Sequence, residues 1–362
     1  MRTVILAAAI GLAAATPAKA DMRVLQEWHG VPNGRFGWAV SELRDIDRDG
    51  VTDVITAEPF APGGGTTWVF SGRTGRALHR FPGVAGDRQG WAVADAGDTD
   101  RDGVDDIVSG ALGRAYLYSG RSGRLLHTWA GPGSGYSVSS AGDMNLDGFD
   151  DVAVGSVAAG EVDIYSGRTY GLLRRLQGAG YGSAVDTSPG ILTPELIVGA
   201  QPGPAHVFAP FASFERLTLQ PPAGAGSFGD FFVAGVGRVD RDLFPDYYVG
   251  DYALSWAGVY SGRDGSLIWA WPGAPGDGRG PGREAGDIDG DGRVDLVVGD
   301  YLASRVNVFS GATGRVLRTW ASADPSEQLG FDAVGVGDTN RDGKPDLLLS
   351  AAAGDTVYLV SS

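Results

Sequence analysis

The sequence predicts an all-β fold, a seven-bladed β-propeller of four-stranded blades in which an N-terminal strand completes the last blade. Three observations lead to this prediction. An acidic motif recurs along the chain, a second motif recurs with the same spacing, and one repeat is divided between the two ends of the sequence. Repeats of this length usually form one supersecondary unit each and bury their apolar surfaces against their neighbours.

The acidic motif has the pattern D-x-[DN]-x-D-G-x-x-D. Five intact copies are found at 45–53, 98–106, 143–151, 287–295 and 338–346. A damaged copy is found at 238–246, and a seventh position, near Asp186, has lost the pattern. The seven starts are 43 to 53 residues apart. This regular interval predicts seven structural units.

The second motif follows each acidic motif, as in VFSGRTGRALHRF from Val69. Its last copy, VYLVSS from Val357, stops at the C-terminus, while RVLQEWHG at 23–30 matches RVLRTWAS at 315–322. A closed ring explains why the N-terminal segment supplies the strand that the last repeat lacks. Two separate β-sandwiches, the alternative all-β arrangement, do not predict a divided repeat.

Each repeat contains four short runs rich in β-branched and aromatic residues, separated by Gly-rich turns. In the second repeat these runs are GWAVADAG, DDIVSGA, AYLYSG and RLLHTWAG. Short runs of this composition, bounded by turn residues, are typical of β-strands. Four-stranded units in a closed ring leave only short strand edges, as propellers do.

The N-terminal 20 residues predict a secretory signal peptide, followed by the propeller domain at 21–362. Arg2 supplies the positive charge, 4–15 is a short apolar run, and Ala18-Lys19-Ala20 is a cleavage site after Ala20. A membrane anchor, the alternative, needs about 20 apolar residues. We therefore expect a secreted protein, either extracellular or periplasmic.

The composition restricts the partners. The formal net charge is −15, which argues against nucleic acid and anionic membranes and favours cations. No later segment has the length and hydrophobicity of a membrane span, and we expect a monomer. The chain has no Cys, so disulfides cannot stabilise its loops.

The intact acidic motifs predict calcium sites. An EF-hand loop has oxygen ligands at positions 1, 3, 5, 7 and 9, Gly at position 6 and a bidentate Glu at position 12. The five copies agree at positions 1, 3, 5 and 6, but position 12 is not acidic and a strand follows the loop. We therefore expect the Asp at position 9 to be the bidentate ligand. Hard oxygen ligands in this number favour Ca²⁺ over Mg²⁺.

About five Ca²⁺ ions are expected, with side-chain ligands at positions 1, 3, 5 and 9 and a carbonyl at position 7. The predicted ligands are Asp45, Asp47, Asp49, Val51 and Asp53; Asp98, Asp100, Asp102, Val104 and Asp106; Asp143, Asn145, Asp147, Phe149 and Asp151; Asp287, Asp289, Asp291, Arg293 and Asp295; and Asp338, Asn340, Asp342, Lys344 and Asp346. The alternative is a set of acidic turns without an ion, but three or four carboxylates on one turn repel one another unless a cation neutralises them.

Two repeats depart from the motif. In the damaged copy, Arg238 replaces the first ligand and Leu243 replaces the Gly. A guanidinium there can neutralise the remaining carboxylates, so we expect no calcium in this copy. We also expect none near Asp186.

These motifs resemble a known family. Phe36-Gly37 before the acidic loop, and Gly-Ala or Gly-Asp after the second strand, resemble the FG-GAP repeat. Seven such repeats are similar to the N-terminal propeller of integrin alpha chains. The resemblance implies a seven-bladed propeller with calcium in the loops between the first and second strands, and a role in adhesion or ligand binding. The Phe-Gly pair recurs at 228–229 but is Gln-Gly or Leu-Gly at 89–90 and 329–330.

Ligand binding is expected on the face opposite the calcium loops. Strands alternate in direction, so the loops between strands two and three and the links between blades meet on that face, and these segments vary between repeats. Tyr252, Trp256 and Tyr301 break the repeat there and are candidate ligand contacts. An aromatic seven residues before the loop start also recurs, at Trp38, Trp91, Tyr136, Phe231 and Phe331. These rings either form a stacking platform around the central channel or pack between blades, the more common role.

These features predict an exported, calcium-binding module for protein or glycan ligands. A carbohydrate-binding, lectin-like propeller is the alternative, and an enzyme acting on polysaccharide is a third. We predict no catalytic residues, because no nucleophile-elbow, zinc-protease or phosphate-loop motif occurs. Trp28, Trp129, Trp271 and Trp320 share one slot in the fourth strand and are expected in the core.

Overall fold

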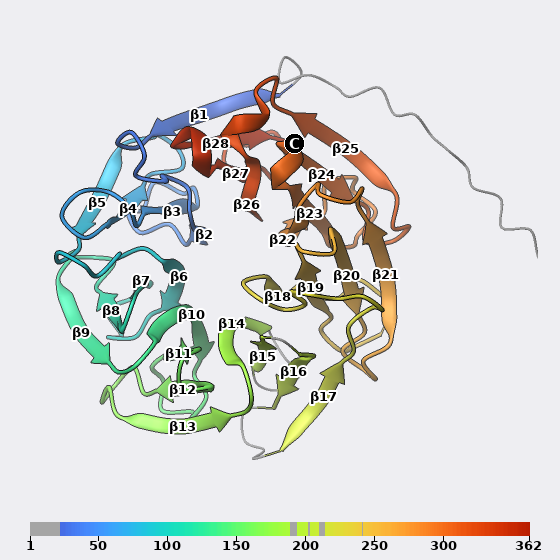
Figure 1. The fold of residues 1–362 in the computed structure, drawn as a ribbon. Helices are drawn as coiled ribbons and strands as arrows, with labels where there is room; N and C mark the ends of the chain where they lie inside the picture. Colours follow the sequence, from blue (N-terminus) through green and yellow to red (C-terminus); the bar gives the residue numbers. More distant parts are fainter. Residues whose placement is uncertain (1–21, 189–193, 202, 210–213, 241) are drawn as a thin grey trace, which may run out of the picture.

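A computed structural model describes residues 22–188, 194–201, 203–209, 214–240 and 242–362. Within these residues the strands form seven four-stranded antiparallel sheets arranged as blades around a central axis (Figure 1). The predicted seven-bladed β-propeller is confirmed. The predicted signal peptide and its cleavage site lie outside the described residues.

The first four blades follow the chain in order. They comprise β2 (Val40–Leu43), β3 (Asp53–Glu58), β4 (Thr66–Phe70) and β5 (Ala77–Pro82); β6 (Ala92–Gly97), β7 (Asp106–Ala111), β8 (Arg114–Tyr118) and β9 (Leu125–Ala130); β10 (Ser134–Gly142), β11 (Asp151–Ser156), β12 (Glu161–Tyr165) and β13 (Leu172–Gln177); and β14 (Tyr181–Ser188), β15 (Glu195–Ala200), β16 (Ala205–Phe208) and β17 (Glu215–Leu219).

The last three blades contain the remaining strands and three short 3₁₀ helices. They comprise β18 (Val233–Gly235), β19 (Tyr247–Asp251), β20 (Trp256–Tyr260) and β21 (Leu267–Pro272); β22 (Arg279–Gly286), β23 (Asp295–Asp300), η2 (Tyr301–Ala303), β24 (Arg305–Phe309) and β25 (Val316–Ala321); and η3 (Pro325–Glu327), β26 (Leu329–Gly335), β27 (Leu347–Ala351), η4 (Ala352–Gly354) and β28 (Thr356–Ser361) with β1 (Arg23–His29).

The ring closes through the N-terminal strand. β1 pairs antiparallel with β28, and Arg23 lies opposite Ser361 while His29 lies opposite Thr356. The seventh sheet therefore has the order β1-β28-β27-β26. This arrangement confirms the closure expected from the divided repeat, and it joins the two ends of the chain by backbone hydrogen bonds.

Apolar side chains are buried mainly between blades. Seven clusters of buried residues lie one at each of the seven blade interfaces. The strand-four tryptophans are core residues as expected, with exposures of 1 to 7%. Three of them also donate Nε1–H bonds to a carbonyl of the next blade, from Trp28 to Gly75, Trp129 to Tyr170 and Trp271 to Gly314, at 2.8 to 3.1 Å. Each blade is thus tied to its neighbour at the outer rim.

The strand order also sets the two ends of the axis. The first strand of each blade lines the centre and the fourth lies at the rim (Figure 1). Because neighbouring strands are antiparallel, the acidic loops between the first and second strands share one end with the loops between the third and fourth. The other loops and the links between blades lie at the opposite end.

Candidate metal loops and the central cavity

The five intact acidic loops share one backbone conformation. The N–H of position 5 donates to the carboxylate at position 1, at 2.9 to 3.0 Å, and the glycine N–H at position 6 donates to the same carboxylate, at 2.7 to 2.9 Å. The glycines at position 6 have φ between +82° and +89°. This left-handed conformation is readily adopted only by glycine, which explains the residue type at this position.

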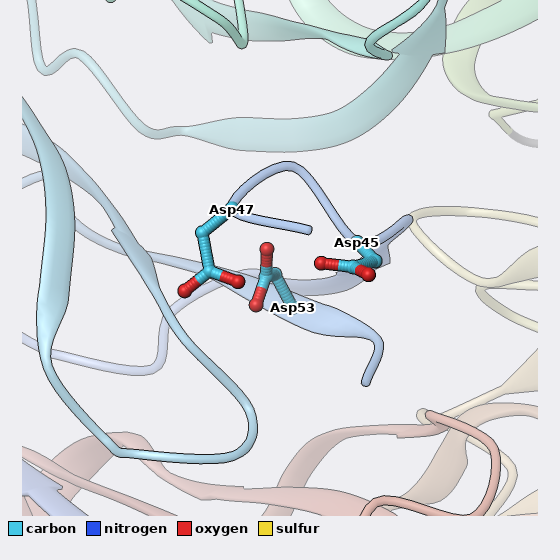
Figure 2. A group of neighbouring side chains, drawn as sticks. All are labelled: Asp45, Asp47 and Asp53. Atoms are coloured by element: carbon cyan, nitrogen blue, oxygen red, sulfur yellow. The ribbon is translucent and has the colours of Figure 1, made fainter. Parts of the chain in front are cut away.

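The loop conformation gathers carboxylates into groups that can hold a divalent cation. Asp45, Asp47 and Asp53 each offer an oxygen within 4.8 Å of the others, and their side chains point toward one another (Figure 2). The same grouping occurs for positions 1, 3 and 9 of the second loop and for positions 1, 3 and 5 of the sixth-blade loop. Clustered hard oxygen donors fit a Ca²⁺-type ion.

The Asp at position 9 connects each acidic loop to the rest of its blade. Asp53 is fully buried; its Oδ2 accepts the Ile46 N–H at 2.9 Å and its Oδ1 accepts the Gly72 N–H at 3.2 Å. Asp106 repeats this pattern with Thr99 and Gly120. Burial raises the pKa of Asp53 and of Asp106 to about 7. An ionised carboxylate is therefore costly here without a counter-charge, and a bound cation would supply one.

In the first two acidic loops, the carboxylate at position 5 accepts a hydrogen bond from a residue outside the acidic loop. Asp102 Oδ2 accepts a 2.8 Å bond from Arg121 Nε, and Asp49 Oδ2 accepts one from Ser71 Oγ at 3.4 Å. Both partners belong to the loop between strands three and four. That neighbouring loop therefore competes for the position-5 side chain that the sequence predicts as a ligand.

In the fourth blade, which lacks the acidic motif, an arginine neutralises the acid at the start of the second strand. Glu195 begins β15, in the register that Asp53 and Asp106 occupy in β3 and β7. Its Oε2 lies 2.6 Å from Arg216 Nη2 and accepts a 2.6 Å bond from the Tyr247 hydroxyl. An internal cation thus neutralises the acid in the blade where calcium is not expected.

Arg216→Ala is expected to destabilise the protein by about 3 kcal/mol, because it leaves the Glu195 carboxylate with little exposure and no cation. Urea unfolding measures this change, and Glu195→Gln in the same variant should restore part of it. Calcium stoichiometry should stay the same in both variants. A loss of only about 0.5 kcal/mol would mean that the pair behaves like a surface salt bridge.

The fifth-blade loop differs from the sequence-based expectation. Asp240, Asp242 and Asp246 offer oxygens within 4.8 Å of one another. Within the described part of the chain, Arg238 forms no ion pair with them, so the neutralisation expected from the sequence is not observed. This loop therefore retains three of the acidic groups found together in the intact copies.

Asp105, the position-8 residue of the second loop, pairs with the preceding blade. Its Oδ2 lies 3.3 Å from Arg44 Nε, and the residue is 8% exposed. Arg44 stands immediately before the first acidic loop, where the second and third blades have Gly97 and Gly142. Asp105 is thus a contact between blades and not one of the predicted calcium ligands.

A cavity of about 460 Å³ occupies the centre of the ring. Aromatic rings from five blades surround its mouth, on the face opposite the acidic loops. The centroids of Trp38 and Trp91 are 4.9 Å apart, those of Trp38 and Phe331 are 5.0 Å apart, and those of Tyr136 and Phe231 are 5.3 Å apart. These residues both pack across blades and line the cavity, so the two roles considered from the sequence coincide.

The candidate ligand contacts separate into two groups. Tyr252 and Tyr301 line the cavity, and Tyr301 packs edge-on against Phe331 at 5.4 Å. Trp256 instead is 6% exposed and packs against Phe228 and Tyr260 in the core between the fourth and fifth blades. Its side chain is therefore not placed to meet a ligand in this structure.

The floor of the cavity contains carboxylates that the sequence reasoning missed. Glu42, Asp95 and Glu284 each stand three residues before an acidic loop, on the innermost strands β2, β6 and β22, and line the cavity. Asp186 and Asp332 line it from β14 and β26. In the sequence these three residues form a recurring acid three positions before the acidic motif, but the recurrence is found in only three repeats.

Helices are scarce in the described residues, and none of them is long and apolar enough to cross a membrane.

Comparison with known proteins supports the assignment of the repeats. Residues 287–349 match the family model described as FG-GAP-like repeat. Integrin alpha-IIb from Homo sapiens is 35% identical over 88 residues, which are 22% of this chain and 8% of that protein. Integrin alpha-V from Gallus gallus is 32% identical over 103 residues, 24% of this chain and 10% of that protein. The similarity thus covers a small part of the length of these relatives.

A solved structure shares the complete ring. One chain in the crystal structure of BBS1N in complex with ARL6DN, soaked with mercury, has a TM-score of 0.64 and 12% identity, covering 94% of this chain and 96% of that chain. At this identity the likeness shows the fold alone. Residues 287–349 thus carry an FG-GAP-like repeat, within a seven-bladed β-propeller that is similar to integrin alpha chains.

Proposed function

We propose that this chain is an exported, calcium-binding β-propeller that binds a protein or glycan ligand on the face opposite its calcium loops. Calcium would be held in five loops by the carboxylates and amides of positions 1, 3, 5 and 9 and by the position-7 carbonyl. Its role there is structural, because it neutralises buried acids such as Asp53 and Asp106 and keeps the loops in one conformation.

The observation that carries the binding proposal is the aromatic mouth of the cavity. Trp38, Trp91, Tyr136 and Phe331 present partly exposed rings around one opening. Flat aromatic faces with polar edges suit both sugar rings and protein side chains.

The proposal is tested with the calcium-loaded chain on a glycan array. Tyr301→Ala and Trp38→Ala are expected to weaken ligand binding about tenfold or more, with the melting temperature monitored to detect misfolding. Phe214→Ala removes an exposed aromatic ring that does not line the cavity and should have no effect. Sugar binding that depends on Trp38 would identify a lectin.

If no glycan binds, the same variants are used in cross-linking to proteins from the surrounding medium or cell surface. A protein ligand should be captured by the unmodified chain and by Phe214→Ala, and lost with Tyr301→Ala. Equal capture by all variants would contradict binding at the aromatic mouth.

A further inference from the structure

The central cavity combines two different chemical environments along the ring axis. Its mouth is aromatic, at Trp38 and Trp91, and its floor is acidic, at Glu42 and Asp95. In both blades the acid follows the aromatic by four residues, which is about 13 Å along an extended chain. A ligand that contacts both environments must therefore be elongated.

The floor has an excess of negative charge. Five carboxylates line the cavity, whereas Arg283 is the one positively charged side chain among its described lining residues. Arg283 is already engaged, since its Nη1 donates to the Val40 carbonyl at 2.7 Å and its Nη2 lies 3.4 Å from Asp332 Oδ2. It is a single positive charge among five carboxylates, and it partly offsets the rise in the pKa of Asp332, Asp186 and Glu42.

Two of the remaining acids have no partner. Among the described residues, neither Glu42 nor Glu284 has a hydrogen bond or an ion pair to its carboxylate. Burial raises the pKa of Glu284 to about 7, and the neighbouring charges of Glu42 and Asp186 add to this rise. A partly buried carboxylate without a donor, such as that of Glu284, is costly to keep ionised, and a positively charged ligand would reduce that cost. Glu42 is exposed, so its carboxylate is open to a ligand that enters the cavity.

From this cavity we infer that the propeller binds a linear aliphatic polyamine, with its ammonium groups on Glu42, Glu284 and neighbouring carboxylates and its methylene segments against the aromatic mouth. The charge balance selects this class. A neutral sugar brings no charge, and one lysine side chain brings a single ammonium for the two carboxylates of Glu42 and Glu284. A metal ion held by the carboxylates would not contact the aromatic rings, whereas both methylene groups and ammonium groups are attracted to them.

This inference does not depend on the proposed protein or glycan ligand. It is tested by titrating spermidine into the full, calcium-saturated chain in a calorimeter, at about pH 8 and about 50 mM salt, where screening is limited. Calcium saturation keeps the polyamine out of the acidic loops. One saturable site per chain is expected, and acetylated spermidine, which has fewer ammonium groups, should bind more weakly.

The decisive variant is Glu42→Gln with Glu284→Gln, which removes two unpaired carboxylates and keeps their shape. It should weaken spermidine binding about tenfold or more, with a melting temperature equal to or above that of the parent chain. The control is Glu27→Gln with Asp264→Asn, which removes the same charge from exposed positions outside the cavity. Spermidine affinity should be unchanged there.

Two results would overturn the inference. One is the absence of saturable spermidine binding to the parent chain. The other is an equal loss of affinity in the cavity variant and the surface control, which would mean that the polyamine only follows the overall net charge of −15.

Discussion

Removal of calcium is expected to lower the melting temperature of the propeller by more than about 10 °C. A ligand at 100 times its Kd stabilises a folded protein by about 2.7 kcal/mol per site, and five loops contribute. The physical cause is the crowding of carboxylates such as Asp45, Asp47 and Asp53, whose oxygens lie within 4.8 Å of one another. Without a cation these groups repel one another or must take up protons.

The measurement is calorimetric melting in excess calcium and in excess chelator. Magnesium should restore less stability than calcium at the same concentration, because Mg²⁺ needs a stricter octahedral site. Titration of the stripped chain then counts the sites. A count of five agrees with the intact motifs, and a sixth would place an ion on Asp240, Asp242 and Asp246. Identical melting curves with calcium and chelator would contradict the calcium proposal.

Asp106→Ala is expected to remove one calcium site and to destabilise the chain by about 3 kcal/mol or more in the presence of calcium. Asp106 is fully buried and accepts bonds from the Thr99 N–H at 3.0 Å, from the Thr99 hydroxyl and from the Gly120 N–H at 3.0 Å. Its loss leaves these donors without a partner. It also disconnects the acidic loop from the loop between β8 and β9.

Asp105→Asn is the matched control, since it changes the adjacent residue, which pairs with Arg44 and is not a predicted ligand. Calorimetric titration should count four calcium ions for Asp106→Ala and five for Asp105→Asn. Unfolding in urea gives the stability change for both. If the two variants bind the same number of ions, position 9 is not a ligand and the proposed coordination is wrong.

The fold and the acidic loops could be predicted from the sequence because both depend on local patterns. Each blade requires the same four strands, so the repeat shows the architecture. The match between 23–30 and 315–322 shows how the ring closes, and β1 indeed pairs with β28. In the loops, positions 1, 3 and 9 lie within nine residues, and the glycine at position 6 sets the turn that brings them together.

The residues of the cavity and the contacts between blades could not be predicted in the same way. Glu42 and Glu284 lie on strands separated by most of the chain, and only ring closure places both at the axis. Similarly, the Glu195 carboxylate accepts hydrogen bonds from Arg216 in β17 and from Tyr247 in the next blade. Sequence spacing carries no information about such neighbours.

Trp256 is a residue for which the sequence predicted a ligand contact and the structure shows a core position. It breaks the repeat and stands at the variable end of β20, which suggested a ligand contact, yet its ring is buried between blades. Successive residues of a strand face opposite sides, and the twist and packing of the sheet decide which side is covered.

By itself, the sequence determined the seven-bladed ring, its closure and the position of the acidic loops, because repetition and short-range spacing encode them. Only the tertiary structure decided that the recurring aromatics form the mouth of a cavity, that unpaired acids lie at its floor, and that an arginine replaces the cation in the fourth blade. These features depend on which side chains from different blades meet at the axis and at the interfaces, and that is set by the packing of the whole ring.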